Sequence, residues 1–433
     1  MPLPQIPRVW LVAGGGWLGR GLQVAAQLIA VRILTDSLGT RGYGAFAVLA
    51  SLAGWLALSD FSIAISLQNH ISERRASEQE AEDIIFTATI LSLAAATIAA
   101  VVLFLSGPWI ATLLLADLSV TSPANGTLAF YAMALPGIGT ALGGVVYKIW
   151  FAQHRGYLSN LLPAAGTIIG TTAVWMVQAG DPQTRLIWSI LLYYAPLALL
   201  PIAALTWTAF RARRHRFRRD FVSPLVRRAA RFWIFGLLAA SVLQVDYIIM
   251  AQMLPPRDIV IYNVASKIFL LVFFVYNALL LALWPVCSEA IARGEWSTIF
   301  ALVRRYVTLG LAFVLVSGLA IAIGSGYLVR IIAPSLAQPL PTTVILLLTI
   351  YTGVRIWTDT FAMILQSMND LPILWITVPI QSALSIGLQV LGVRLFGLPG
   401  LIVGLTACFV LTVGWILPLR CAWHARRRVG IAQ

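Results

Sequence analysis

The chain has 433 residues, of which 60% are hydrophobic and only 11% are charged. A soluble protein carries about 25% charged residues, so this composition excludes a soluble fold of that length. In a membrane protein the formal net charge of +14 reports topology and does not call for a nucleic-acid partner.

Apolar runs of about 20 residues, the length that crosses a bilayer as a helix, recur along the whole chain. They predict an all-α polytopic membrane protein, because only helices and closed barrels satisfy the backbone in hydrocarbon. Twelve transmembrane spans are expected: 9–34, 44–68, 84–105, 128–151, 161–178, 186–210, 232–254, 259–286, 306–328, 343–365, 373–395 and 398–419.

The spans form two sets of six, which predicts two six-helix lobes. The expected organisation is an N-terminal lobe 1–210, a basic linker 211–231, a C-terminal lobe 232–420 and a tail 421–433. Leu22-Gln23-Val24 followed by Tyr43, and Leu243-Gln244-Val245 followed by Tyr262, begin the two lobes with similar spacing. This short match suggests an internal repeat, and substrates of such folds bind near the midplane between the halves.

The basic residues are distributed unevenly between the two sides of the membrane. An even number of spans puts both termini on one side, which receives roughly 21 basic residues against roughly 5 on the other. Both termini are therefore expected in the cytoplasm. Nine arginines of the linker lie on that side, against anionic lipid head groups. An amphipathic interfacial helix around 221–231, with Phe221, Leu225 and Phe232 on its apolar side, is one form that the linker can take.

Gly14-Gly15-Gly16-Trp17-Leu18-Gly19 matches the glycine pattern of dinucleotide-binding loops. It follows no strand and lies inside a predicted span, so it predicts no nucleotide site. Small residues in a span allow close helix packing or a bend. The three cysteines form no CxxC motif, so no metal site or cofactor is expected.

Charged residues inside the spans are the candidate functional residues, because each one costs about 2.5–3.5 kcal/mol at mid-helix. The candidate substrate-binding residues are Arg20, Arg32, Lys267 and Arg355, and a basic cavity favours an anionic substrate. The candidates for ion coupling or gating are Asp60, Asp246 and Asp359.

Structural roles remain open for most of these charges. Arg32 either snorkels to the interface or pairs with Asp36, and Arg355 has Asp359 at i+4 as an internal partner. Asp246 and Lys267 form either a structural pair or an ion-binding site. Asp60 is either a helix cap or a gate. No residue pattern for catalysis is present, which predicts that the protein is not an enzyme.

Six segments of the chain form a recognisable set: Leu38-Gly39-Thr40-Arg41-Gly42-Tyr43-Gly44-Ala45-Phe46, Ser59-Asp60-Phe61-Ser62-Ile63-Ala64, Asn69-His70-Ile71-Ser72-Glu73, Gln244-Val245-Asp246, Tyr262-Asn263-Val264-Ala265-Ser266-Lys267 and Leu283-Trp284-Pro285. These segments resemble polysaccharide flippases of the Wzx type, within the multidrug/oligosaccharidyl-lipid/polysaccharide exporter superfamily. One departure is Ser62, where that family often has glycine.

The resemblance implies two six-helix lobes around a central cleft in a bacterial inner membrane. It also implies transport of an undecaprenyl-diphosphate-linked oligosaccharide to the periplasmic leaflet by alternating access, for O-antigen or exopolysaccharide assembly. Arg20 is the best match to a cationic cleft residue of the family, and Arg355 is a weaker one. The implied partners are the lipid-linked oligosaccharide, membrane lipids, and a polysaccharide polymerase with other assembly proteins.

Three alternatives to this function stay open. A multidrug exporter of the same fold would prefer an acidic cleft for organic cations. The sequence does little to distinguish an oligosaccharide flippase from a lipid II flippase. A membrane polymerase or glycosyltransferase would need larger external loops than those predicted here.

Overall fold

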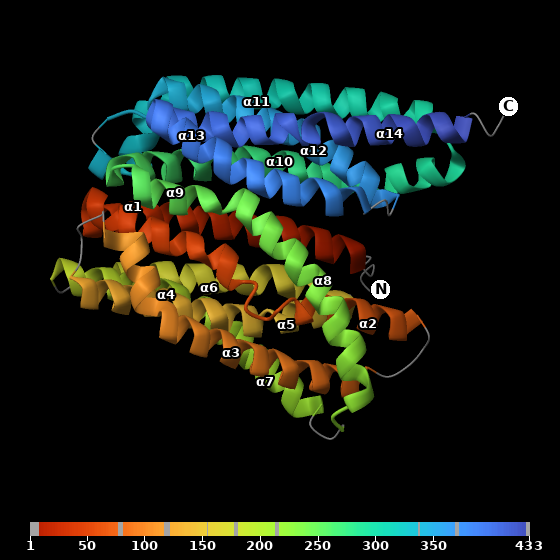
Figure 1. Cartoon of the computed structure of the whole chain (residues 1–433), viewed down its shortest axis with the longest axis horizontal. Helices are drawn as coiled ribbons and strands as arrows, with labels where there is room; N and C mark the ends of the chain where they lie inside the picture. Colours follow the sequence, from red (N-terminus) through yellow and green to blue (C-terminus); the bar gives the residue numbers. More distant parts are fainter. Residues whose placement is uncertain are drawn as a thin grey trace, which may run out of the picture. The chain divides into compact units, whose positions relative to one another are not determined.

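The computed structural model describes residues 8–76, 81–116, 122–153, 155–176, 181–212, 216–336, 338–368 and 372–429. Within these ranges every regular element is helical, so the predicted all-α class is confirmed (Figure 1). Parts of the predicted linker, 213–215, and of the predicted tail, 430–433, lie outside the described residues.

The chain divides into two compact units, Met1–Ala240 and Ser241–Gln433. Unit 1 contains α1 to α7 and most of α8; unit 2 contains α9 to α14. The helices are α1 (Arg8–Leu56), α2 (Ile63–Ala76), α3 (Glu82–Leu115), α4 (Pro123–Gly143), α5 (Val145–Ala152), α6 (Gly156–Met176), α7 (Pro182–Ala212), α8 (Arg219–Leu243), α9 (Val245–Met253), α10 (Pro256–Arg293), α11 (Trp296–Ile332), α12 (Thr342–Ser367), α13 (Pro372–Leu411) and α14 (Val413–Val429).

Helical segments that suit a bilayer make up most of both units. In the described residues, seven segments are long and apolar enough to cross a membrane, and the bent α8–α9 pair would be an eighth. One of the seven, Trp375–Arg426, has 52 residues and contains a kink, so it includes two of the predicted spans. All twelve predicted spans overlap helices.

Two of the predicted loops are glycine kinks inside continuous helices. Gly39 has φ 66° and Gly397 has φ 62°, and these residues join the first span to the second and the eleventh to the twelfth. Both angles lie in the left-handed region, which glycine enters without a Cβ penalty. The chain can therefore reverse its direction within one residue, and no separate loop is needed.

Other spans break at short non-helical segments. Residues 57–62 separate α1 from α2, Gly144 separates α4 from α5, and Gln244 separates α8 from α9 with a bend of 42°. In the first break Phe61 and Ser62 have φ 49° and 58°, a conformation that is uncommon outside glycine. The backbone at Ser62 thus gives a physical reason for the glycine that is frequent there in Wzx-type flippases.

Helix α8 carries the predicted amphipathic segment, and its apolar side contacts protein. Phe221, Leu225 and Ala229 are buried in the core of unit 1, together with residues of α2, α3 and α5. Ser66 of α2 donates a hydrogen bond of 3.0 Å to the carbonyl of Leu225. Phe232, the third residue expected on that side, is only partly buried. The opposite side, which includes Arg227 and Arg231, is exposed.

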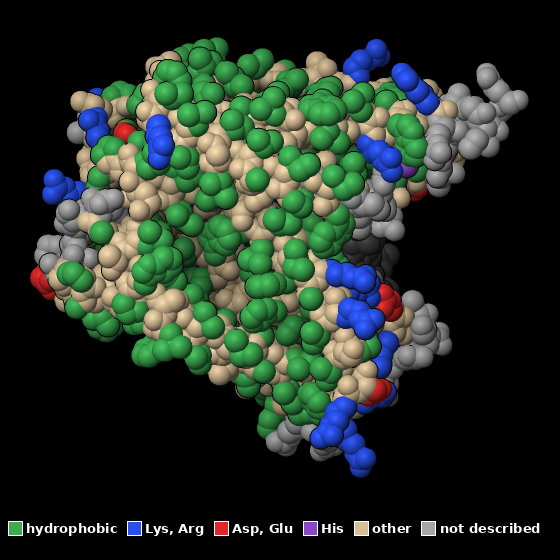
Figure 2. Space-filling model, viewed as in Figure 1, with side chains coloured by type: hydrophobic (Ala, Val, Ile, Leu, Met, Phe, Trp, Pro, Cys, Tyr) green, Lys and Arg blue, Asp and Glu red, His purple; other side chains and the backbone are tan. Residues whose placement is uncertain are grey.

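Large hydrophobic side chains remain exposed over much of each unit. Phe104, Leu105, Ile323 and Tyr327 are examples, and in Figure 2 hydrophobic side chains cover most of the visible face while Lys and Arg gather toward the ends. A soluble protein rarely exposes apolar patches of this extent. Such a surface fits contact with lipid hydrocarbon.

Candidate functional site

Among the described residues of unit 2, the most buried charged one is Asp246, in the first turn of α9 directly after the bend of the seventh span. Its Oδ2 accepts a hydrogen bond of 2.6 Å from the hydroxyl of Tyr262, and its Oδ1 accepts one of 2.9 Å from the backbone N–H of Tyr247. Asn263 donates through Nδ2 to the Tyr247 hydroxyl at 2.7 Å. We call these four residues the Asp246 cluster.

Lys267 lies on α10, within the same unit, and is partly buried. The structure does not pair it with Asp246, because no acidic oxygen of a described residue lies within 4.0 Å of its ammonium. The alternative of an Asp246–Lys267 ion pair is therefore wrong in this structure. The carboxylate takes its hydrogen bonds from Tyr262 and a backbone N–H instead.

Arg355 lies in the middle of α12 and forms the predicted ion pair with Asp359, at 2.9 Å between Nη2 and Oδ2. Its Nη1 donates to the Tyr351 hydroxyl at 3.2 Å. The guanidinium also lies 5.0 Å from the ring centroid of Phe273 and 5.2 Å from that of Phe409. Distances of this size permit cation–π attraction. We call these five residues the Arg355 cage.

The residues of the cage that offset the charge of Arg355 lie on three helices, α10, α12 and α13. The side chains of Arg355 and Asp359 remain 20% and 28% exposed. A guanidinium that is stacked on aromatic rings keeps further N–H donors, which suits bidentate binding of an anion. The ion pair and a contact with an anionic ligand are therefore compatible.

The two candidate arginines of unit 1 lie on α1. Arg20 follows Gly19 and its side chain is exposed. Arg32 is paired with Asp36 at 3.9 Å, with both side chains about half exposed, so the predicted i,i+4 pair is present. An exposed pair of this kind contributes little to stability.

Gly16 and Gly19 of the glycine-rich segment face α6. A Cβ on Gly19 would lie 2.4 Å from the backbone oxygen of Asn160, and one on Gly16 would lie 3.2 Å from the Asn160 amide. The expectation that these small residues allow close helix packing is confirmed. Arg20, the next residue after Gly19, therefore lies directly beside the contact of α1 with α6.

Asp60 lies in the break between α1 and α2 and acts as a helix cap. Its carboxylate accepts hydrogen bonds from the backbone N–H groups of Ser62 and Ala64, at 2.8 and 3.1 Å. A side-chain oxygen that satisfies the first free N–H groups of a helix stabilises the helix start. Of the two roles left open for Asp60, the structure contains the cap.

Lys148 is a cation that the sequence pattern missed. The count of basic residues puts it on the cytoplasmic side although the predicted span 128–151 contains it, and the structure places it on α5 within the candidate span Pro123–Ala152. It is partly buried and interacts electrostatically with Asp60.

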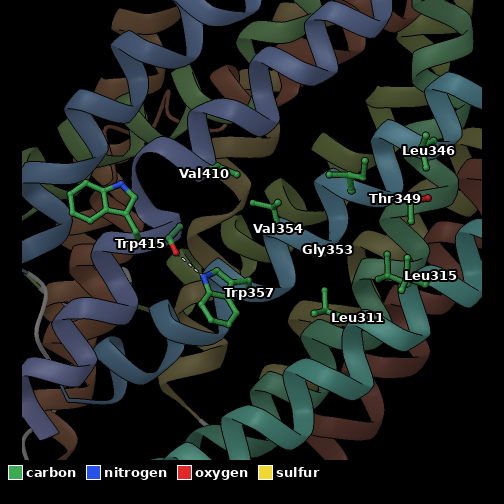
Figure 3. A pocket seen from close by; sticks show the side chains of 12 residues that line it. Leu311, Leu315, Leu346, Thr349, Gly353, Val354, Trp357, Val410 and Trp415 are labelled. Carbon is green, nitrogen blue, oxygen red and sulfur yellow. Dashed lines mark hydrogen bonds between the residues drawn. The ribbon is translucent and has the colours of Figure 1, made fainter.

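An apolar groove lies on another side of α12, with a volume of about 630 Å³. Figure 3 shows Leu311 and Leu315 of α11 across from Val354 and Trp357 of α12, with Trp415 of α14 beyond. The Trp357 indole donates a hydrogen bond of 2.7 Å to the carbonyl of Gly414, which joins two of these helices. The groove is separate from the Arg355 cage, and its lining offers almost no polar partner to a head group.

The family model described as "Polysaccharide biosynthesis protein" matches residues 12–291. A proposed O-antigen export protein of Yersinia pseudotuberculosis is 36% identical over 96% of this chain and 96% of its own length. A proposed O-antigen transporter of Salmonella typhi is 33% identical over 98% of both chains.

Solved structures with the same fold have far lower sequence identity. A multidrug resistance MATE family transporter of the MOP superfamily, in an inward-facing conformation, matches with a TM-score of 0.76 at 12% identity, over 95% of this chain and 96% of that one. The lipid II flippase MurJ, in an inward closed conformation, matches with a TM-score of 0.69 at 12% identity, over 94% and 86%. At this identity the likeness shows the fold alone. The family match and the full-length relatives show that this multi-pass membrane protein belongs to the polysaccharide biosynthesis protein family.

Proposed function

We propose that this chain is a flippase that moves an undecaprenyl-diphosphate-linked oligosaccharide from the cytoplasmic to the periplasmic leaflet, for O-antigen or exopolysaccharide assembly. The observation that carries the proposal is similarity over the whole length. Three relatives named as proposed O-antigen exporters or transporters are 31% to 36% identical over at least 96% of this chain. The fold shared with transporters supports alternating access as the mechanism.

The proposed contacts for the anionic head group are Arg20, Arg32, Lys267 and Arg355. Arg355 has the strongest structural support, because its cage orients the guanidinium while several N–H donors remain. Lys267 is supported by its position in a candidate span without an acidic partner within 4.0 Å among the described residues. Arg20 is supported by its exposure on α1, and Arg32 more weakly because Asp36 already offsets its charge.

The proposed residue for ion coupling is Asp246, with Asp359 and Asp60 as further candidates. Asp246 is supported by its burial and its position beside a helix break, where a change of protonation would alter local hydrogen bonding. Asp359 is engaged by Arg355 and Asp60 by two backbone N–H groups, so a gating role fits each better than free titration.

The proposed location is the bacterial inner membrane, with both termini in the cytoplasm. The asymmetry of basic residues and the exposed arginines of α8 support this orientation and a contact with anionic lipid. A polysaccharide polymerase and other assembly proteins are proposed as partners from the assignment to polysaccharide assembly alone.

The alternatives are less well supported. The MATE transporter and MurJ share only the fold with this chain, at 12% identity, so neither drug export nor lipid II transport gains sequence support from them. A polymerase or glycosyltransferase would not be expected among relatives that are named as exporters.

Deletion of the gene, followed by complementation, tests the proposal. The deletion strain should lose surface polysaccharide and accumulate its lipid-linked precursor, and the wild-type chain should restore both. Arg20→Ala should insert normally yet fail to restore polysaccharide, whereas Arg227→Ala on exposed α8 should restore it. Normal surface polysaccharide in the deletion strain contradicts the proposal. Increased drug sensitivity, or arrested cell-wall synthesis, would favour one of the two alternatives of the same fold.

A further inference from the structure

Lys148 is a cation within a candidate span that has no function assigned so far. Its helix, α5, packs Val145, Val146 and Ile149 into the core of unit 1. Lys148 itself is only partly buried, so its side chain remains in part accessible to a ligand. A charge at such a position is costly, and charges of this kind commonly mark substrate pathways.

The nearby acid, Asp60, does not form an ion pair with this lysine. The two groups interact electrostatically, yet no oxygen of Asp60 lies within 4.0 Å of the ammonium. No other acidic oxygen of a described residue lies that close either. An ammonium has three N–H donors, so Lys148 retains its full capacity to bind an anion.

The backbone holds Asp60 in place. Its two carboxylate oxygens accept the N–H groups of Ser62 and Ala64, and the intervening Phe61 packs against Trp233 at 5.0 Å between ring centroids. Trp233 in turn donates a hydrogen bond of 3.0 Å to the carbonyl of Leu58. Movement of Asp60 toward Lys148 would break the cap of α2. The carboxylate therefore attracts the ammonium from a fixed position and leaves its donors unoccupied.

We propose that Lys148 is a substrate-contact residue of unit 1 that binds the diphosphate of the lipid-linked oligosaccharide, in competition with the fixed charge of Asp60. This inference rests on the proposed function and adds a fifth cation to the four proposed above. A compact ammonium suits a diphosphate oxygen as a point charge. Asp60 attracts the ammonium as the diphosphate does, so its charge competes with the ligand.

Binding of short prenyl probes to the purified full-length protein in nanodiscs tests the inference. Farnesyl diphosphate and farnesol share a tail and differ in the diphosphate, and calorimetry gives the Kd for each. Lys148→Met should weaken farnesyl diphosphate binding about 10-fold to 100-fold, as expected for one lost hydrogen bond to a charged group, and leave farnesol binding unchanged. Lys148→Arg should retain most of the affinity.

Asp60→Asn tests the competition between the charge of Asp60 and the diphosphate. The amide retains an acceptor for the cap but removes the competing charge, so farnesyl diphosphate should bind more tightly than to the wild type. Arg227→Met removes an exposed charge of the same sign in the same unit and should leave both Kd values unchanged.

The inference is overturned if Lys148→Met binds farnesyl diphosphate like the wild type, or if it loses farnesol and the diphosphate equally. It is also overturned if the wild type does not prefer the diphosphate to farnesol. If any of these results is found while the deletion strain still lacks surface polysaccharide, only the role of Lys148 is contradicted and the proposed function stands. Normal polysaccharide in that strain counts against the proposed function itself.

Discussion

The carboxylate of Asp246 accepts a hydrogen bond of 2.6 Å from the hydroxyl of Tyr262, a residue that follows it by 16 positions on the next helix. Both residues are buried, with relative exposures of 6% for Asp246 and 5% for Tyr262. A buried carboxylate is tolerated only when hydrogen bonds compensate for its lost hydration. The link between α9 and α10 therefore holds a titratable group at the bend of the seventh span.

The first prediction distinguishes the contribution of this hydrogen bond to stability from a role of Asp246 in transport. Tyr262→Phe leaves the Asp246 oxygen without its side-chain donor and should lower the free energy of unfolding by about 1–3 kcal/mol. Asp246→Asn keeps an acceptor for Tyr262 and should unfold near the wild-type temperature, yet fail to restore polysaccharide in the deletion strain. Thermal unfolding in detergent and complementation measure the two effects. Full complementation by Asp246→Asn would exclude ion coupling through this residue.

The second prediction concerns Arg355 and Asp359, which are paired at 2.9 Å. Arg355→Met leaves a partly buried carboxylate unpaired and should destabilise the protein by up to about 3–5 kcal/mol. Combining it with Asp359→Leu should recover much of that loss, because no charge remains to be compensated. Both variants should fail to restore polysaccharide, since each lacks the proposed anion contact. If the stable double variant supports normal export, Arg355 has only a structural role.

The third prediction compares two glycines on one helix. Gly19→Ala places a methyl group 2.4 Å from the Asn160 backbone oxygen and should force α1 away from α6. Gly21→Ala is the matched control, because nothing lies within 4 Å of its Cβ position. It should stabilise the helix by about 0.5–1 kcal/mol. The unfolding temperatures should therefore shift in opposite directions, and a rise for both would show that α1 and α6 can separate without loss.

The fourth prediction concerns the attachment of α8 to unit 1. Leu225 is completely buried, so Leu225→Ala should cost about 2–5 kcal/mol. Arg227→Gln, two residues further along and exposed, should change stability by less than about 0.5 kcal/mol. Hydrogen exchange of the α8 amides measures the effect directly. Equal protection of α8 in both variants would mean that its apolar side contributes nothing to docking.

Much of the fold follows from hydrophobic length and turn chemistry. Each predicted span overlaps a helix, and the pairs Arg32–Asp36 and Arg355–Asp359 follow from i,i+4 spacing on one helix. The kinks at Gly39 and Gly397 were expected to be loops. A single left-handed glycine can join two helices where the composition also suits a loop, so composition alone does not distinguish a kink from a loop.

Contacts between helices were harder to predict. Asp246 and Lys267 could pair by their place in the sequence but form no ion pair with each other, whereas Lys148, which the count of basic residues puts on the cytoplasmic side, interacts electrostatically with Asp60. Tyr351 gave no signal as a partner of Arg355, because a tyrosine in a span is ordinarily an interfacial residue. Which side chains meet depends on the rotation of each helix about its axis and on bends such as the one of 42° between α8 and α9.

The amino-acid sequence by itself determined that this chain is an all-α membrane protein with an excess of cations, because hydrophobic run length and charge count need no tertiary contact. Only the tertiary structure decided that Asp60 caps α2 and that the apolar side of α8 packs on protein. It also decided that aromatic rings from three helices surround Arg355. Each of these depends on groups brought together from distant positions. Their partners are fixed by packing geometry rather than by spacing along the chain.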